Sequence, residues 1–181
     1  MASDQISVLN LKIYHEKQKR QLCLLHALNN LFQKEEFRQA ELDDICENFD
    51  DRRWFNSHRS WIGLGNYDAN ILVAALELKE LSVVWFDRRL SVNRINHEAV
   101  MAYIFNVPSI SYIPFMKGRH WFTVRRFDDH YYNLDSKLQS AVRIDDFVAF
   151  SNQILAEGNQ LLLVTRPEDQ EKCINRGDEE T

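Results

Sequence analysis

Four residues from two distant parts of the chain carry the side chains that a thiol-based acyl-transfer site requires. Cys23 is a candidate nucleophile, and His120 is a candidate base that would hold it as a thiolate. Asn133 could fix the imidazole ring, and the amide of Gln18 could donate to a developing oxyanion. Together these residues predict a cysteine that attacks a carbonyl carbon.

Each of these residues also has a structural interpretation, and a second histidine competes for the role of base. An isolated cysteine in a helix, or a histidine in a strand, more often belongs to the core than to an active site. His26 follows Cys23 by three residues and lies on the same side of a helix, but it approaches the thiol poorly, so we interpret it as structural. Cys23 and His26 could form half of a zinc site, but the sequence has no second close pair with ligand spacing.

The segment around Cys23 predicts an amphipathic helix over residues 21–33. Leu22, Leu25, Leu28 and Phe32 recur at spacings of three and four residues. Cys23 then lies at or near the first turn, where unpaired backbone N–H groups and the helix dipole favour a negative charge. The sequence therefore places the candidate nucleophile where a thiolate is stabilised.

The later part of the chain shifts from helical to strand patterns, which predicts an α+β fold with a helical subdomain packed on one side of a small, mostly antiparallel sheet. Asp68 is a candidate N-cap and Gly158 a candidate C-cap, while Asp128 and Asp129 suit a tight hairpin. Helices are expected at 39–49, 69–79, 94–105 and 145–157, and strands at 81–86, 109–115, 119–127, 130–135 and 160–165.

The hairpin gives the candidate site a geometry. His120 begins one strand and Asn133 lies on the next, and neighbouring strands are only about 4.8 Å apart. The Asn133 amide therefore reaches the imidazole if the register permits it. Asp135 shares the strand face of Asn133, and the residues alone leave open which of the two orients His120.

Length and composition indicate one globular domain. The chain has 181 residues, of which 45% are apolar and 27% charged. We expect a catalytic domain over residues 14–166, between a flexible N-terminus (1–13) and a disordered acidic tail (167–181). Residues 166–181 carry six acidic and three basic side chains, or −3 of the net −5, so the body is nearly neutral. Without a basic face, nucleic acid is not an expected partner.

The cysteines and the N-terminus point to the cytoplasm. Three cysteines, Cys23, Cys46 and Cys173, are widely spaced without a CxxC pair, which argues against a disulfide framework. Cys46 is most simply a small buried hydrophobe, and Cys173 lies in the polar tail. The N-terminus has no signal-peptide pattern, and no run of about 20 apolar residues could span a membrane. We therefore expect a soluble cytoplasmic protein with no integral membrane segment.

Three blocks around the candidate residues resemble the signatures of the Josephin family of deubiquitinating cysteine proteases. They are YHEKQKRQLCLLHALNNLFQ at 14–33, HWFTVRR at 120–126 and YYNLDS at 131–136. HRSWIGLGNYDANILVAAL at 58–76 and WFDRR at 85–89 are similar to the small, single-domain members in particular. The likeness covers roughly residues 14–165.

The resemblance implies a papain-like fold and a thiol protease that hydrolyses isopeptide bonds at the C-terminal glycine of ubiquitin, without a metal or other cofactor. It implies Cys23 as nucleophile, His120 as general base and acid, Asn133 rather than Asp135 as the ring-orienting residue, and Gln18 as oxyanion donor. It also implies a helical lid at 38–58 over the ubiquitin tail, which ends in two glycines. Candidate ubiquitin contacts are Trp54, Phe55, Trp61 and Tyr67, each of which could equally belong to the core.

Two other functions are compatible with the same scaffold. A non-catalytic ubiquitin-binding adaptor would keep the fold, but it would not need the four residues Gln18, Cys23, His120 and Asn133 together. A thiol acyltransferase would use the same Cys-His pair with an amine acceptor in place of water. Release of free ubiquitin without an acceptor distinguishes hydrolysis from transfer.

Overall fold

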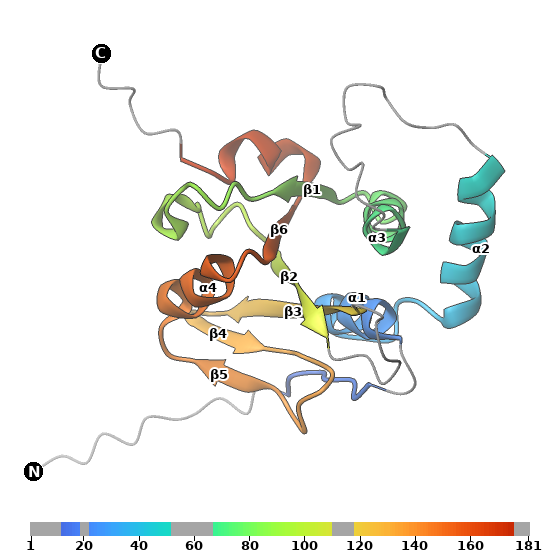
Figure 1. Ribbon diagram of the computed structural model, residues 1–181, viewed down its shortest axis with the longest axis horizontal. Helices are drawn as coiled ribbons and strands as arrows, with labels where there is room; N and C mark the ends of the chain where they lie inside the picture. Colours follow the sequence, from blue (N-terminus) through green and yellow to red (C-terminus); the bar gives the residue numbers. More distant parts are fainter. Residues whose placement is uncertain (1–11, 19–21, 52–66, 110–117, 176–181) are drawn as a thin grey trace, which may run out of the picture.

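The computed structural model describes residues 12–18, 22–51, 67–109 and 118–175 (Figure 1). They form a six-stranded sheet in the order β1-β6-β2-β3-β4-β5, in which every neighbouring pair is antiparallel. The helices are α1 (Cys23–Phe32), α2 (Gln39–Asp51), α3 (Tyr67–Glu77) and α4 (Phe147–Ala156), with short 3-10 helices η1 (Val92–Arg94) and η2 (Pro167–Lys172). The strands are β1 (Ser82–Trp85), β2 (Ala102–Ser109), β3 (Gly118–Phe127), β4 (His130–Asn133), β5 (Val142–Ile144) and β6 (Gln160–Thr165).

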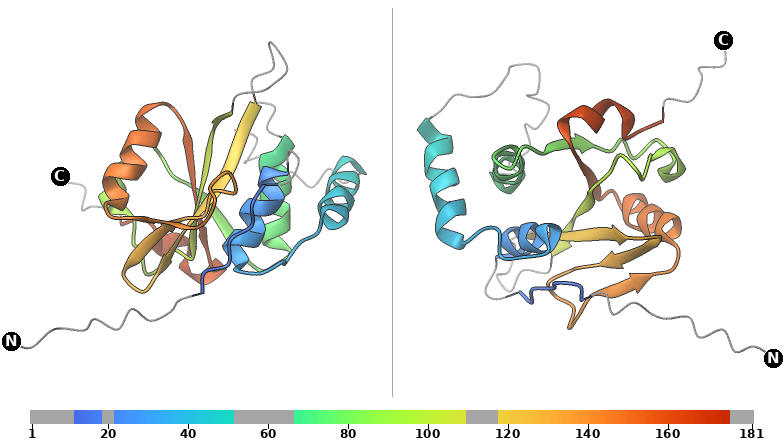
Figure 2. Two further views of the ribbon diagram at one scale, coloured as in Figure 1. Left: turned by 90° about the horizontal axis from the view of Figure 1, so that it is seen from below. Right: turned by 180° about the vertical axis from the view of Figure 1, so that it is seen from behind.

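Helices cover both faces of the sheet, which corrects the prediction that they would pack on one side only. Residues of α1 and α3 form a first core with one face of β2, β3 and β6. Residues of α4 and η1 form a second core with the other face of the same strands. The two views of Figure 2 show α1 and α3 on the side opposite α4, with α2 at the periphery beside them, and Leu42 of α2 contributes to the first core. The predicted α+β class is confirmed. The sheet lies between two apolar cores, and this packing fixes the positions of the residues that its strands carry.

The strand β2 overturns the predicted helix over residues 94–105. Ala102, Tyr103, Ile104 and Phe105 are consecutive and all fully buried, because β2 lies between β6 and β3 with side chains in both cores. A strand covered on both faces has no polar alternation, so its apolar run resembles that of a buried helix. Of the predicted strand at 109–115, only Ser109, the last residue of β2, falls within the described residues.

Other boundaries differ in ways that follow from local chemistry. Helix α3 begins at Tyr67, so Asp68 lies inside it and is not the N-cap. Asp146 caps α4 by accepting from the Ala149 N–H at 2.8 Å, and α4 ends at Ala156, with Gly158 beyond it at φ +81°. Strand β5 was not predicted, because its side chains are largely exposed and give no apolar pattern.

The beginning of the acidic tail is ordered, contrary to the prediction that it is disordered from residue 167. Pro167 opens η2, and Cys173 beyond it is buried in the second core. The Asn96 N–H donates to the Cys173 carbonyl at 2.9 Å, and Ile95 pairs with Ile174. In the described part of the chain, no helix is long and apolar enough to cross a membrane.

Candidate active site

His120 lies near the start of β3, where its ring is buried against the second core. The ring stacks on Phe122 with centroids 6.2 Å apart and an interplanar angle of 25°. His120 Nε2 lies 2.7 Å from Asp135 Oδ1, so the imidazole donates to the carboxylate. The side chain of His120 is 3% exposed and that of Asp135 17%, which leaves the pair little screened by water.

The carboxylate of Asp135, and not the amide of Asn133, contacts the His120 ring. The reason is register: β3 pairs Val124 with Asn133, so Asn133 lies four residues beyond His120 along the hairpin. Four strand residues span about 13 Å, which is too far for a side-chain contact. The sequence offered both candidates, and only the register distinguishes them.

Asn133 holds the backbone of Asp135 through a hydrogen bond. Its Oδ1 accepts a hydrogen bond from the Asp135 N–H at 2.9 Å, which turns the chain at the end of β4. Asp135 Oδ1 also accepts from the Lys137 N–H at 2.8 Å. The carboxylate oxygen that meets His120 is therefore fixed by a backbone donor as well.

Electrostatics favours the protonated imidazole. Burial acts to lower the pKa of His120, but the hydrogen bonds to Asp135 and Cys23 and the charge of Asp135 outweigh it, so this pKa is raised. Because Nε2 is used by Asp135, the hydrogen bond to the thiol falls to Nδ1. The pair is arranged for proton transfer from Cys23 to His120.

Cys23 is the first residue of α1 and is half-buried. Leu22 at the N-cap provides no side-chain hydrogen bond, and the first turn contains no acidic residue. The backbone N–H groups of this turn are thus not capped by a side chain, and they favour a negative charge beside them. The predicted position of the nucleophile at a helix N-terminus agrees with the structure.

Gln18 is tied to the segment that follows Asp135. Its N–H donates to the Ser136 carbonyl at 2.7 Å, and Ser136 Oγ donates to Gln18 Oε1 at 3.4 Å. Asn30 Nδ2 in α1 donates to the neighbouring Leu134 carbonyl at 2.8 Å. The short segment 134–136 thereby connects the N-terminal stretch, α1 and the partner of His120.

His26 faces away from this cluster toward the N-terminal stretch. Its Nδ1 lies 2.7 Å from Glu16 Oε2, and Asn29 Nδ2 donates to the same carboxylate. The His26 side chain is 9% exposed. This buried network agrees with the structural role inferred for His26.

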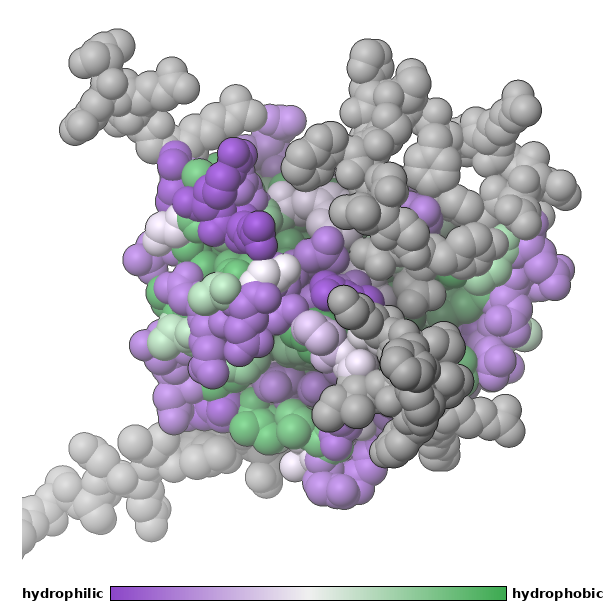
Figure 3. Space-filling model, viewed as in Figure 1, coloured by the Kyte–Doolittle hydropathy of each residue, from purple (hydrophilic) through white to green (hydrophobic). Residues whose placement is uncertain are grey.

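The predicted ubiquitin contacts are largely beyond the described residues. Trp54, Phe55 and Trp61 fall outside them, and Tyr67 is described only as the first backbone position of α3. Among the described residues, no group of three or more His, Cys, Asp or Glu side chains could hold a metal ion. On the face seen in Figure 3, apolar side chains occur in small areas separated by polar ones.

Comparisons with known proteins add a family context to this geometry. A family model described as Josephin matches residues 18–165. The chain is 45% identical to a Josephin-like protein of Drosophila melanogaster, over 84% of this chain and 73% of that protein. It is 40% identical to human Josephin-2, over 88% of this chain and 89% of that protein. Human Ataxin-3 is 27% identical over 84% of this chain and 45% of its own length.

Proposed function

The chain belongs to the Josephin family, and on this premise we propose that it is a deubiquitinating cysteine protease that hydrolyses isopeptide bonds at the C-terminal glycine of ubiquitin. The observation that carries the proposal is the hydrogen bond between His120 and Asp135, with the thiol of Cys23 interacting with the same imidazole ring. A thiol beside a histidine whose ring is held by a carboxylate is the arrangement of an activated nucleophile.

In the first half-reaction, the Cys23 thiolate attacks the carbonyl carbon of the terminal glycine. The proton taken from the thiol resides on His120, and the negative charge of Asp135 stabilises the resulting imidazolium. His120 then donates this proton to the departing lysine amine as the C–N bond breaks. The product is a thioester between ubiquitin and Cys23.

In the second half-reaction, His120 accepts a proton from water, which attacks the thioester carbonyl. The C–S bond breaks and the proton returns to the Cys23 sulfur, which restores the enzyme and releases ubiquitin with a free carboxylate. Both tetrahedral intermediates carry an oxyanion, for which we propose the Gln18 amide and the Cys23 N–H as donors. The hydrogen bonds of Gln18 to Ser136 support this role, because they fix the segment that carries it.

Recognition of ubiquitin is proposed to involve the lid over residues 38–58. Helix α2 supports this proposal, because it lies at the edge of the molecule in Figure 1 and is anchored there by packing against α3 and by Leu42 in the first core. Trp54, Phe55, Trp61 and Tyr67 stay predicted ubiquitin contacts. Cys23, Cys46 and Cys173 form no disulfide with one another.

A ubiquitin with a thiol-reactive electrophile in place of its C-terminal carboxylate tests the proposal. The wild-type chain is expected to gain the mass of one ubiquitin, and Cys23→Ala is expected to gain none. Cys173→Ala, which removes a thiol buried in the second core, is the matched control and should still be labelled. Labelling of Cys23→Ala would overturn the nucleophile assignment.

Hydrolysis of a ubiquitin-lysine isopeptide in water, followed by mass spectrometry, separates the remaining alternatives. Release of free ubiquitin supports a hydrolase. Binding of ubiquitin without release would indicate an adaptor, and release that requires an added amine would indicate an acyltransferase.

A further inference from the structure

Arg119, which precedes His120 in β3, is a half-buried cation that no carboxylate among the described residues pairs with. Its Nε donates to Asn106 Oδ1, and its Nη2 donates to the Asn106 carbonyl at 2.8 Å. No ion pair of Arg119 occurs within the described residues, in contrast to Arg126, which pairs with Glu98 and Asp129. Burial without a compensating charge lowers the pKa of Arg119.

The side chains beside Arg119 offer further hydrogen-bonding atoms that have no partner. Asn106 is fully buried, and its Nδ2 is not hydrogen-bonded. Trp121, directly opposite Asn106 across the β2–β3 pair, is also fully buried with an unpartnered Nε1. Gln160, opposite Asn106 on β6, has an unpartnered Oε1. Leaving such atoms unsatisfied costs about 1–3 kcal/mol each, so a cluster of them needs an explanation.

This cluster lies next to the candidate nucleophile. Thr123 Oγ1 donates to the Ala27 carbonyl at 2.8 Å, and Arg125 Nη1 donates to the Leu31 carbonyl. Four helix residues and two strand residues both advance about 6–7 Å, so α1 and β3 run in step. Four residues before Ala27 in α1 is Cys23, and two residues before Thr123 in β3 is Trp121, so Cys23 lies beside Trp121. Cys23 also packs against the core that contains Trp121.

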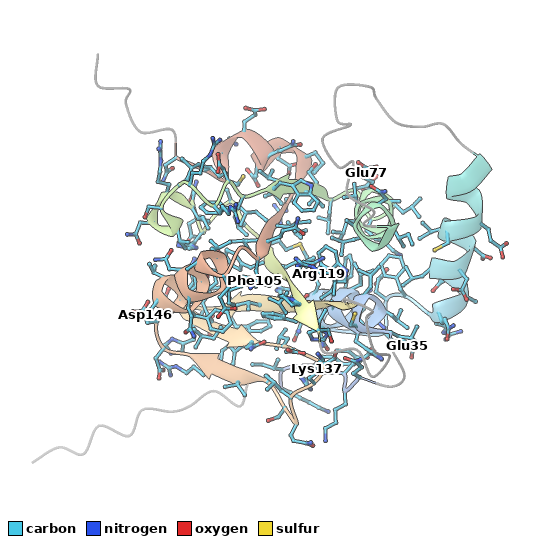
Figure 4. The ribbon with its side chains drawn as sticks, viewed as in Figure 1. Glu35, Glu77, Phe105, Arg119, Lys137 and Asp146 are labelled. Carbon is cyan, nitrogen blue, oxygen red and sulfur yellow. The ribbon has the colours of Figure 1, made fainter. Side chains whose placement is uncertain are left out.

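Arg119 precedes Trp121 by two residues on the same face of β3, which places the two residues about 7 Å apart along the strand. Figure 4 shows the labelled Arg119 near the end of β2, beside α1. Alternation along the strand places Arg119 and Trp121 on the face opposite His120. Arg119 is therefore positioned to meet a substrate group that flanks the scissile bond and not to take part in proton transfer.

The guanidinium of Arg119 indicates a negatively charged ligand that accepts hydrogen bonds. Two of the N–H groups of Arg119 are used on Asn106, which fixes the guanidinium plane, and the others remain for a ligand. A carboxylate matches this geometry and replaces the missing counter-charge. The ubiquitin side of the scissile bond ends in two glycines, which carry only peptide groups there, so a carboxylate side chain beside that bond belongs to the chain that bears the modified lysine.

We propose that Arg119, held by Asn106, binds an acidic side chain that flanks the ubiquitinated lysine of the substrate. The enzyme then cleaves ubiquitin faster from lysines in acidic surroundings than from lysines in neutral ones. This inference rests on the proposed deubiquitinase function and adds a preference on the acceptor side.

Two substrates test this preference directly. Each is ubiquitin joined through its terminal glycine to the lysine of a short peptide, with Glu on both flanks in one peptide and Gln in the other. For the wild-type chain, kcat/KM is expected to be about tenfold higher with the Glu peptide, as for one charge-assisted contact at about 1.4 kcal/mol per tenfold. The ratio should fall with added salt, because the contact is ionic.

Variants assign the preference to Arg119. Arg119→Gln should bring the Glu/Gln ratio to about one, whereas Arg119→Lys, which keeps the charge, should retain part of it. Arg166→Gln is the matched control, because it removes an exposed arginine just beyond the other end of β6 and should leave the ratio unchanged. Should the Arg119 variants fail to fold, the wild-type ratio and its salt dependence still test the proposal.

The outcomes separate this inference from the function on which it rests. A wild-type ratio near one, with Cys23-dependent hydrolysis of both peptides, overturns the acidic preference and leaves the protease intact. A ratio unchanged in Arg119→Gln assigns the preference to other residues and also overturns the proposal. Absence of hydrolysis of either peptide refutes the proposed function itself.

Discussion

Replacement of Asp135 by asparagine tests the arrangement around His120 with almost no change of shape. Asp135→Asn retains an oxygen that can accept from His120 Nε2 and from the Lys137 N–H, but it removes the negative charge. The 2.7 Å contact is largely shielded from water, since the carboxylate is only 17% exposed. Hydrogen bonds to charged groups contribute about 1.5–3 kcal/mol. If that amount is lost from the imidazolium-bearing transition state, kcat falls roughly 10- to 100-fold.

The same substitution changes the pH dependence in a defined direction. The pKa of His120 is raised in the folded protein, so the imidazolium that protonates the leaving amine persists to higher pH. Activity is lost as pH rises through this pKa. Asp135→Asn lowers the pKa of His120, so the descending limb of the kcat profile moves to lower pH. Stability follows the same sign: the contribution from His120 is present at low pH and lost as pH rises through the folded-state pKa.

The assay is kcat against pH for a ubiquitin-lysine isopeptide, with wild type, Asp135→Asn and Asn133→Ala in parallel. Asn133→Ala removes only the hydrogen bond to the Asp135 N–H and should lower kcat without moving the descending limb as far. An unchanged limb in Asp135→Asn would refute the assignment of Asp135 to His120. If Asn133→Ala moved the descending limb further than Asp135→Asn does, Asn133 would be the residue that orients His120.

Three further predictions concern the oxyanion donor and the framework. Gln18→Ala should lower kcat roughly 100- to 1000-fold while ubiquitin affinity, measured by titration calorimetry, stays near the wild-type value; a parallel loss of both would contradict an oxyanion role. Thr123→Val should lower the free energy of unfolding in urea by about 1–3 kcal/mol, because it deletes the buried hydrogen bond to the Ala27 carbonyl, and an unchanged midpoint would show that this bond contributes nothing. Gly158→Ala should destabilise the chain by about 1 kcal/mol in the same measurement, since residue 158 has φ +81°, and a gain in stability would contradict the strain argument.

The parts of the fold with a distinct local pattern could be predicted from the sequence. Helix α1 has a clear apolar face, and β6 is a short apolar run after a glycine, and both lie close to their expected bounds. Strand β2 could not be predicted, because a central strand covered by two cores shows no alternation. Its identity depends on β3 and β6, which are distant in the sequence.

The candidate site shows the same division. Cys23 and His120 were identified by residue type, order and position in their elements, and in the folded chain the thiol of Cys23 interacts with the His120 ring. The choice between Asn133 and Asp135 depended on a register that places Val124 opposite Asn133. The sequence did not point to Arg119, because its hydrogen bonds to Asn106 depend on the pairing of β2 with β3 and are known only from the structure.

The order of the strands has a consequence for synthesis of the protein on the ribosome. Among the described strands, β6 comes last in the sequence and yet lies between β1 and β2, whereas α1, with its thiol, precedes all of them. Domains generally fold as units, and synthesis proceeds at roughly 5–20 residues per second. The centre of the sheet cannot close until β6 has left the exit tunnel, so Cys23 and His120 are synthesised well before the sheet that positions them is complete.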